Sequence, residues 1–222
     1  MRFGEANGQL DAEFNPFTDE YLGEILEAVA MAWARMKHPK SSEIEIRITR
    51  KLAAQLRHDP VFRNLPFDVC QEYILDNLDA EYLGRLDLHI KYRRSQRDYF
   101  AFEAKRLHLR TGGIPSSEYL TYVGNKGMGG YIEGPYSDNL PVAGMIAYVM
   151  DANTDTAWLG LGAKIVEKQN DLCLRADSRL EESALVDRVR HALTGTRLGE
   201  THHDLKTRIL RIFHMLLPVI SK

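Results

Sequence analysis

Two acidic residues and one lysine lie near the middle of the sequence, on segments where apolar residues alternate with other residues. Asp87 stands in Leu-Asp-Leu-His-Ile, and Glu103 and Lys105 stand in Phe-Ala-Phe-Glu-Ala-Lys. Carboxylate oxygens are ligands that Mg²⁺ takes together with water and phosphate. A neighbouring ammonium can orient or deprotonate a water molecule, or stabilise charge on a phosphoryl group. If the three side chains meet, they form a site for metal-assisted attack on a phosphodiester.

The alternation predicts two strands that would bring these side chains together. Apolar residues alternate over 86–92 and 100–105, and the polar run 93–97 is typical of a turn. With the turn centred on Ser95, the hairpin places Asp87 opposite Glu103, at a Cβ separation of roughly 4.5–5.5 Å. Lys105 then shares a face with Glu103, and the backbone carbonyl of Ala104 offers the metal another oxygen. The alternative is a solvated polar face whose ion pairs contribute little stability.

At these residues the sequence resembles the PD-(D/E)XK nuclease superfamily. The resemblance lies in Arg85-Leu-Asp-Leu-His-Ile and in Phe100-Ala-Phe-Glu-Ala-Lys-Arg-Leu107, with Leu86 where the family's proline would stand. It implies that Asp87 and Glu103 bind Mg²⁺ or Mn²⁺ and that Lys105 is the catalytic lysine. It further implies a restriction-endonuclease-like core, cleavage of DNA in preference to RNA, and a role in restriction or phage defence. The resembling region covers about residues 43–150.

The resemblance also points to a glutamate on the first core helix as a further metal ligand. Glu45, near the start of the helix expected from about Ser42 to His58, is the candidate, and Glu43 is a weaker one. The competing interpretation is a capping box, in which Glu45 bonds back to the Ser42 backbone at the helix start.

Basic residues crowd the predicted hairpin. Residues 91–110 contain Lys91, Arg93, Arg94, Arg97, Lys105, Arg106 and Arg110, against Asp98 and Glu103 alone. A local basic rim suits a phosphate backbone, and Arg94, Arg97 and Arg106 are the candidate nucleic-acid contacts, with Lys126 from a glycine-rich segment. The commoner use of such a run is a solvated turn.

The remaining segments predict a mixed α/β plan, with a central mixed β-sheet flanked by helices. Further helices are expected at Thr18–Lys37, Phe67–Leu78, Thr156–Leu172 and Glu181–Leu193, and a buried strand at Val142–Met150. Arg208–Leu217 fits either a helix or a strand, and we favour the strand. His202-His203-Asp204 suggests a surface turn and His214 a core residue. We expect one domain over residues 1–222, with its core at about 42–150.

Composition and charge limit the classes of protein to which this chain can belong. A formal charge of −2 and a pI of about 6.5 argue against a protein that coats nucleic acid unaided, so we expect a homodimer or a larger complex to assist targeting. Two distant cysteines exclude a disulfide framework, and the absence of an apolar leader favours a cytoplasmic protein. The rival hypothesis is a catalytically inactive nuclease-like scaffold that binds a partner protein or nucleic acid.

Overall fold

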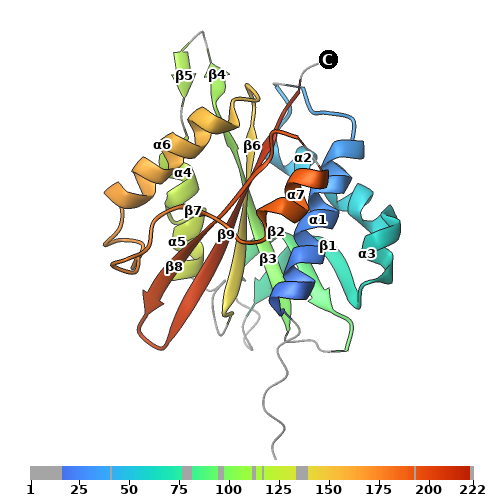
Figure 1. Cartoon of the computed structure of the whole chain (residues 1–222), viewed down its shortest axis with the longest axis horizontal. Helices are drawn as coiled ribbons and strands as arrows, with labels where there is room; N and C mark the ends of the chain where they lie inside the picture. The colour runs from blue at the N-terminus through green and yellow to red at the C-terminus, as the bar shows by residue number, and fades with distance from the viewer. Residues whose placement is uncertain are drawn as a thin grey trace, which may run out of the picture.

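A seven-stranded mixed β-sheet forms the centre of the molecule (Figure 1). The computed structural model describes residues 17–40, 42–76, 82–94, 98–111, 114–116, 118–133, 140–192 and 194–220. The strand order is β1-β2-β3-β6-β9-β8-β7. The predicted α/β class, with a mixed sheet between helices, is therefore confirmed.

The central pairings of the sheet are parallel and the outer ones antiparallel. β3 and β9 run parallel to β6, whereas the pairs β1–β2, β2–β3, β8–β9 and β7–β8 are antiparallel. The strands are β1 Phe67–Asp76, β2 Tyr82–Tyr92, β3 Tyr99–Leu107, β6 Val142–Val149, β7 Glu181–Glu182, β8 Arg197–Leu205 and β9 Arg208–Pro218. A second, two-stranded sheet contains β4 Leu109–Thr111 and β5 Ile114–Ser116.

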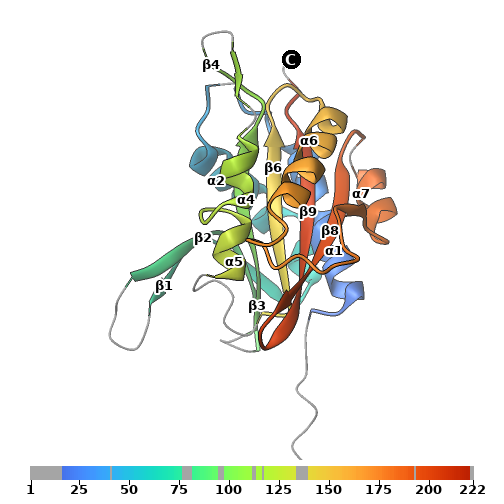
Figure 2. The same ribbon diagram turned by 90° about the vertical axis from the view of Figure 1, so that its left-hand side faces the viewer.

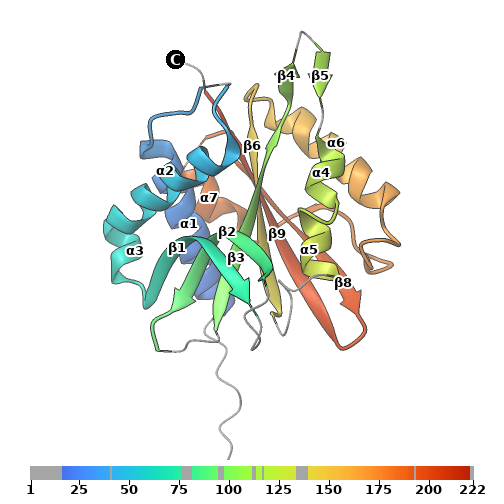
Figure 3. The same ribbon diagram turned by 180° about the vertical axis from the view of Figure 1, so that it is seen from behind.

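Helices cover both faces of the sheet (Figures 1 and 3). One face carries α1 Asp19–Arg35, α2 Glu45–His58, α3 Pro60–Asn64 and α7 Val186–Ala192. The other carries α4 Tyr119–Val123, α5 Met128–Ile132 and α6 Thr154–Glu167. Because parallel strands cannot be joined by a tight turn, the chain passes through β4, β5, α4 and α5 between β3 and β6.

The first core cluster packs α1 and α2 against the sheet. Apolar residues recur at helical spacing along α1, so one side of the helix is buried. Trp33 stacks on Tyr148 of β6 with ring centroids 5.1 Å apart, and its Nε1 donates to the Pro218 carbonyl at 3.0 Å. The predicted helices Thr18–Lys37 and Ser42–His58 are thus confirmed, with slightly shorter bounds. The predicted strands at Val142–Met150 and Arg208–Leu217 are confirmed as well.

The predicted helix at Phe67–Leu78 is wrong, because Phe67–Asp76 forms strand β1. Phe67 and Val69 are buried, whereas Asp68 and Cys70 between and beyond them are exposed, which is the two-residue period of a strand. Pairing with β2 along nearly its whole length satisfies the backbone groups on one side of β1. Residues 77 and 78 of the predicted helix lie outside the described residues.

Two predictions in the C-terminal third are also wrong. Within the described part of the expected helix Glu181–Leu193, only Val186–Ala192 is helical, because Glu181–Glu182 pairs with β8 as an edge strand. Leu193 lies outside the described residues. The expected surface turn at His202-His203-Asp204 is part of β8, which pairs with β9. The expected helix Thr156–Leu172 is confirmed as α6 but ends at Glu167.

Two buried histidines, His203 and His214, link β8 and β9. A position in the core was predicted for His214 but not for His203. His214 bonds to the Tyr122 hydroxyl at 3.1 Å and to Thr201 Oγ1 at 2.9 Å. His203 bonds to the same Thr201 hydroxyl at 2.8 Å, and its Nδ1 donates to the Leu172 carbonyl. Burial lowers the pKa of His203 to about 4 and that of His214 to about 3. Both rings are therefore neutral parts of the core.

The β1–β2 hairpin extends beyond the rest of the sheet (Figure 2). β2 pairs with β3 only from Leu88 to Lys91, whereas it pairs with β1 from Tyr82 to Tyr92. β2 therefore leaves β3 just before Leu88, and within the described residues no strand pairs with this side of β3 beyond that point. Among the described helices, none is both long enough and apolar enough to cross a bilayer.

Candidate metal centre

The predicted hairpin register is confirmed where β2 and β3 pair. Leu88 lies opposite Phe102, and Ile90 lies opposite Phe100. The ladder ends at Leu88–Phe102, one residue before the expected pair of Asp87 and Glu103. The Asp87 carboxylate instead accepts the backbone N–H of Ala104 at 2.9 Å. Asp87 therefore reaches β3 through its side chain.

The side-chain alternation of β2 changes phase at Asp87. Leu88 packs in the core cluster beneath α1 and α2, whereas Leu86 packs in the cluster on the opposite face. Glu72 stands across from Asp87 on β1, where the ladder is interrupted, and has the left-handed backbone angle φ = 53°. Such an angle is uncommon for a residue with a side chain. The prediction that Leu86 shares a face with Leu88 is wrong, and the change of face coincides with this irregularity in the pairing of β1 and β2.

Lys105 brings the acids of the site together. Its Nζ donates to Glu103 Oε1 at 2.6 Å and to the Ala104 carbonyl at 2.8 Å, and lies 3.5 Å from Glu45 Oε1. Glu103 and Lys105 are each 6% exposed and Asp87 is 9% exposed. The predicted residues of the site therefore meet in one largely buried cluster.

Glu45 belongs to this cluster and is not a helix cap. α2 begins at Glu45 with Ile44 as its N-cap residue, and no side chain caps it. Glu45 Oε2 accepts the backbone N–H of Arg106 at 3.1 Å. The capping-box interpretation is therefore wrong, because the carboxylate is turned toward β3. Glu43, the weaker candidate, pairs with Lys51 at 2.5 Å, away from this cluster.

The pKa values of Glu45, Glu103 and Lys105 are all raised, so each group binds a proton more readily and the cluster favours additional positive charge. Burial first and the charge of Asp87 second raise the pKa of Glu103 to about 8, against the opposing effect of Lys105. Burial also raises the pKa of Glu45. Burial alone would lower the pKa of Lys105, but the three carboxylates outweigh it and raise the pKa. Three acids around one ammonium thus leave an excess of negative charge.

The donor chemistry fits a hard divalent cation. Glu103 Oε2 is buried and has no hydrogen-bond partner, so one carboxylate oxygen is available to a ligand. Carboxylate oxygens and a carbonyl are the ligand types that Mg²⁺ and Mn²⁺ prefer. Among the residues that the structure describes, no three His, Cys, Asp or Glu residues are placed so that they could hold a metal ion as they stand. The Lys105 ammonium, which holds Glu103 and the Ala104 carbonyl, occupies this space.

The structure disperses the predicted nucleic-acid contacts. Arg106 lies at the cluster, where its guanidinium donates to the Glu43 carbonyl at 2.9 Å. Arg94 is exposed after the end of β2, and Lys126 is exposed in the turn between α4 and α5. Arg97 lies outside the described residues. Tyr122 and Tyr131, on the helices on either side of Lys126, are fully buried packing residues.

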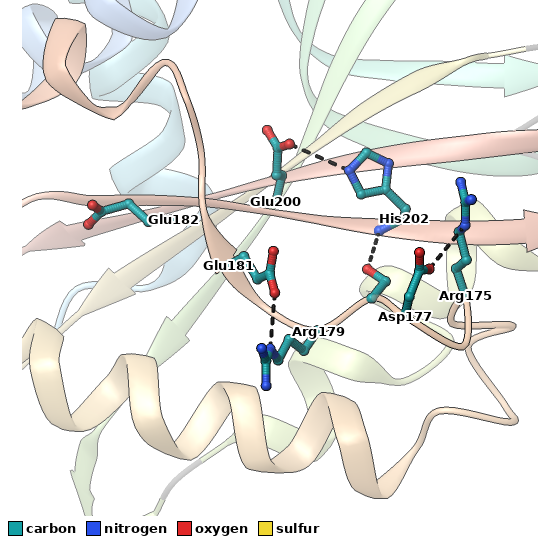
Figure 4. A pocket seen from close by; sticks show the side chains of 8 residues that line it. Arg175, Asp177, Arg179, Glu181, Glu182, Glu200 and His202 are labelled. Atoms are coloured by element: carbon teal, nitrogen blue, oxygen red, sulfur yellow. Dashed lines mark hydrogen bonds and ion pairs between the residues drawn. The ribbon is translucent and has the colours of Figure 1, made fainter.

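A separate hollow of about 280 Å³ lies beside β8 (Figure 4). Two arginines, Arg175 and Arg179, face four acidic residues there. Arg175 pairs with Asp177, and Arg179 pairs with Glu181. This hollow is acidic and its arginines are paired, so it does not suit a phosphate.

Sequence comparison with known proteins adds no assignment to this geometry. No protein-family model matches the chain, and it matches neither a curated protein nor a solved structure. The chemical interpretation of the cluster therefore depends on its residues and contacts.

Proposed function

We propose that this protein is a divalent-metal-dependent nuclease that hydrolyses phosphodiester bonds of DNA, in preference to RNA. The observation that carries the proposal is the buried cluster of Glu45, Asp87 and Glu103 around Lys105, with one Glu103 oxygen unpartnered. A buried excess of negative charge is costly unless a cation compensates it. A divalent ion compensates the negative charge that remains after pairing with Lys105 and favours the ionised form of Glu103.

The order of the elements supports a restriction-endonuclease-like core. A helix, α2, precedes the hairpin β2–β3, and the helices α4 and α5 lead to the next strand, β6. Asp87 lies on one strand of that hairpin, and Glu103 and Lys105 lie on the next. This arrangement is the one that the resemblance to the PD-(D/E)XK nucleases implies. A role in restriction or phage defence follows from the same resemblance.

Each residue of the cluster has a role in this proposal. Asp87 and Glu103 hold the ion, with the Ala104 carbonyl and Glu45 as further oxygen ligands. When bound, the ion supplies Lewis acidity to the phosphate and lowers the pKa of water. Asp87 and Glu45 are oriented by the Ala104 and Arg106 N–H groups. Lys105 keeps protons on its Nζ and donates them in hydrogen bonds to phosphoryl oxygens as their charge grows.

A catalytically inactive scaffold that binds a partner is the second candidate. It is favoured by the contacts of Lys105, whose ammonium already bonds two oxygens of the cluster and neutralises part of its charge. In that case the lysine would serve as a permanent substitute for a metal ion.

Metal titration combined with DNA cleavage tests the two candidates. We expect the native protein to bind Mn²⁺ in calorimetry and to cut plasmid DNA. Asp87→Asn should lose both properties, whereas Lys105→Ala should bind Mn²⁺ and cut about 10²–10³-fold more slowly. Lys168→Ala, which removes an exposed lysine beyond α6, is the matched control and should behave as the native protein. A native protein that neither binds Mn²⁺ nor cuts DNA would establish the scaffold.

A further inference from the structure

A cavity of about 370 Å³ lies at the far end of α2 from the acidic cluster. Arg57, Arg63 and Arg93 surround it, against a single acid, Asp68. Phe62 and Phe67, which are almost fully buried, contribute to its apolar lining. Its charge is the reverse of that of the hollow beside β8, which has four acids and two arginines.

Two of the three arginines keep their charge uncompensated. Within the described part of the chain, Arg57 donates only to the Val69 carbonyl, at 3.3 Å, and Arg63 is exposed. Among the described residues, neither forms an ion pair with a carboxylate. Arg93 pairs with Asp68 at 3.0 Å, but Asp68 is itself 64% exposed. The cavity therefore presents guanidinium groups that an anion can reach.

A basic stripe connects this cavity with the acidic cluster. Arg47, Arg50 and Arg57 are exposed and follow one another at three- and seven-residue spacing, so they lie on one side of α2. The stripe begins two residues after Glu45 and is about 15 Å long at 1.5 Å per residue. β1 lies beside it, since Arg50 pairs with Glu72 and Arg57 reaches Val69. Glu72 also faces Arg85, so a net positive charge remains along the contact.

We propose that this stripe and the Arg57–Arg63–Arg93 cavity bind the phosphate backbone of DNA and guide a strand from the cavity to the acidic cluster. The inference rests on the proposed nuclease function, since it assigns the substrate-binding surface of that site. A length of about 15 Å spans several phosphates of one strand, which are spaced about 3.4 Å apart along a duplex axis. A small anion would need only one end of such a surface. Guanidinium groups form paired hydrogen bonds with phosphate oxygens.

DNA binding under different salt concentrations tests this surface without cleavage. A fluorescein-labelled DNA duplex is titrated in EDTA and followed by anisotropy. We expect Arg57→Ala/Arg63→Ala to bind roughly tenfold or more weakly and to lower the slope of log K against log salt by about 2, one for each lost phosphate contact. Arg57→Lys/Arg63→Lys keeps both charges and should retain most of the slope. Arg175→Ala/Arg179→Ala, at the acidic hollow, is the matched control and should bind as the native protein does.

The outcomes separate this inference from the nuclease proposal. Hydrolysis of bis(p-nitrophenyl) phosphate with Mn²⁺ uses a substrate too small to reach the cavity, so the arginine variant should hydrolyse it at the native rate. Equal DNA binding by the native protein and the alanine pair overturns the inference, whatever the hydrolysis shows. Competition by polyglutamate as effective as that by DNA also overturns it, in favour of an acidic protein partner. Arginine-dependent DNA binding without any hydrolysis supports the surface and removes the nuclease.

Discussion

Replacing Glu103 by glutamine should make the metal-free protein more stable, although it removes an ionisable partner of Lys105. The fold raises the pKa of Glu103 from 4.5 to about 8, first through burial and then through Asp87. At pH 7 the unfolded chain therefore holds this carboxyl ionised, whereas the folded protein must keep it protonated. Each pKa unit corresponds to about 1.4 kcal/mol, so folding loses about 3 kcal/mol at this pH. Glutamine has nearly the same shape and no charge, so Glu103→Gln should recover this free energy.

The pH dependence of unfolding shows at which pH Glu103 destabilises the folded protein. Because the folded-state pKa is raised, the stability associated with this carboxyl is fully present below pH 4.5 and is lost as the pH rises toward 8. We expect the variant and the native protein to unfold alike in urea near pH 4.5 with EDTA. At pH 7 the variant should gain about 3 kcal/mol, or roughly 6–12 °C in Tm.

A divalent metal ion should reverse the order of stability of the native protein and Glu103→Gln. The native protein should gain stability on addition of Mn²⁺, because an ion that binds only the folded state stabilises it. Glu103→Gln should gain little, since one carboxylate ligand is gone. Glu133→Gln, which changes an exposed glutamate after α5, should follow the native protein throughout. The reasoning fails if Glu103→Gln is less stable than the native protein at pH 7 in EDTA.

Three further predictions concern the framework around the site. The free energy of unfolding of the native protein should fall by about 2 kcal/mol for each of His203 and His214 as the pH drops from 6.5 to 5, because their lowered pKa values keep them neutral in the fold. In urea unfolding, His203→Asn should reduce this dependence of stability on pH. Gly144→Ala should cost about 1–3 kcal/mol in the same measurement, because the new methyl group would overlap the Phe102 ring; an unchanged midpoint would contradict this packing. Asp59→Ala should lower the Tm by an amount equivalent to about 2 kcal/mol, because the Asp59 carboxylate caps α3 and pairs with Arg35; a Tm equal to that of the native protein would refute the cap.

The hairpin register could be predicted because two apolar faces had to match. Leu88 with Phe102 and Ile90 with Phe100 is a pairing that buries large side chains on one face. The irregularity at Asp87 could not be predicted, since Leu86 continues the alternation in the sequence. Only the three-dimensional fold decides that Leu86 is buried on the opposite face. The residues of the cluster were therefore found from the sequence, whereas the way Asp87 reaches β3 was not.

β8 was missed because its buried side is partly polar. Thr201 and His203 face the core, where they bond to each other and to His214. An alternation of apolar with polar residues is thus absent from this strand, although the backbone alternates normally. Similarly, Ser42 and Glu45 satisfy the local pattern of a capping box. The Arg106 N–H that binds Glu45 is 61 residues away and gives no local signal.

The departure of β2 from β3 explains how one small region can hold several buried acids. Successive N–H groups on the same edge of a strand are two residues apart, and those of Ala104 and Arg106 would ordinarily bond to carbonyls of a neighbouring strand. Here the Asp87 and Glu45 carboxylates accept these two N–H groups instead. Each acid is thereby anchored by one oxygen, which offsets part of the cost of its burial and fixes its orientation. A fully paired β2 would supply carbonyls at these positions and leave the acids without donors. The break in the ladder is therefore the feature of the fold that makes this cluster of carboxylates possible.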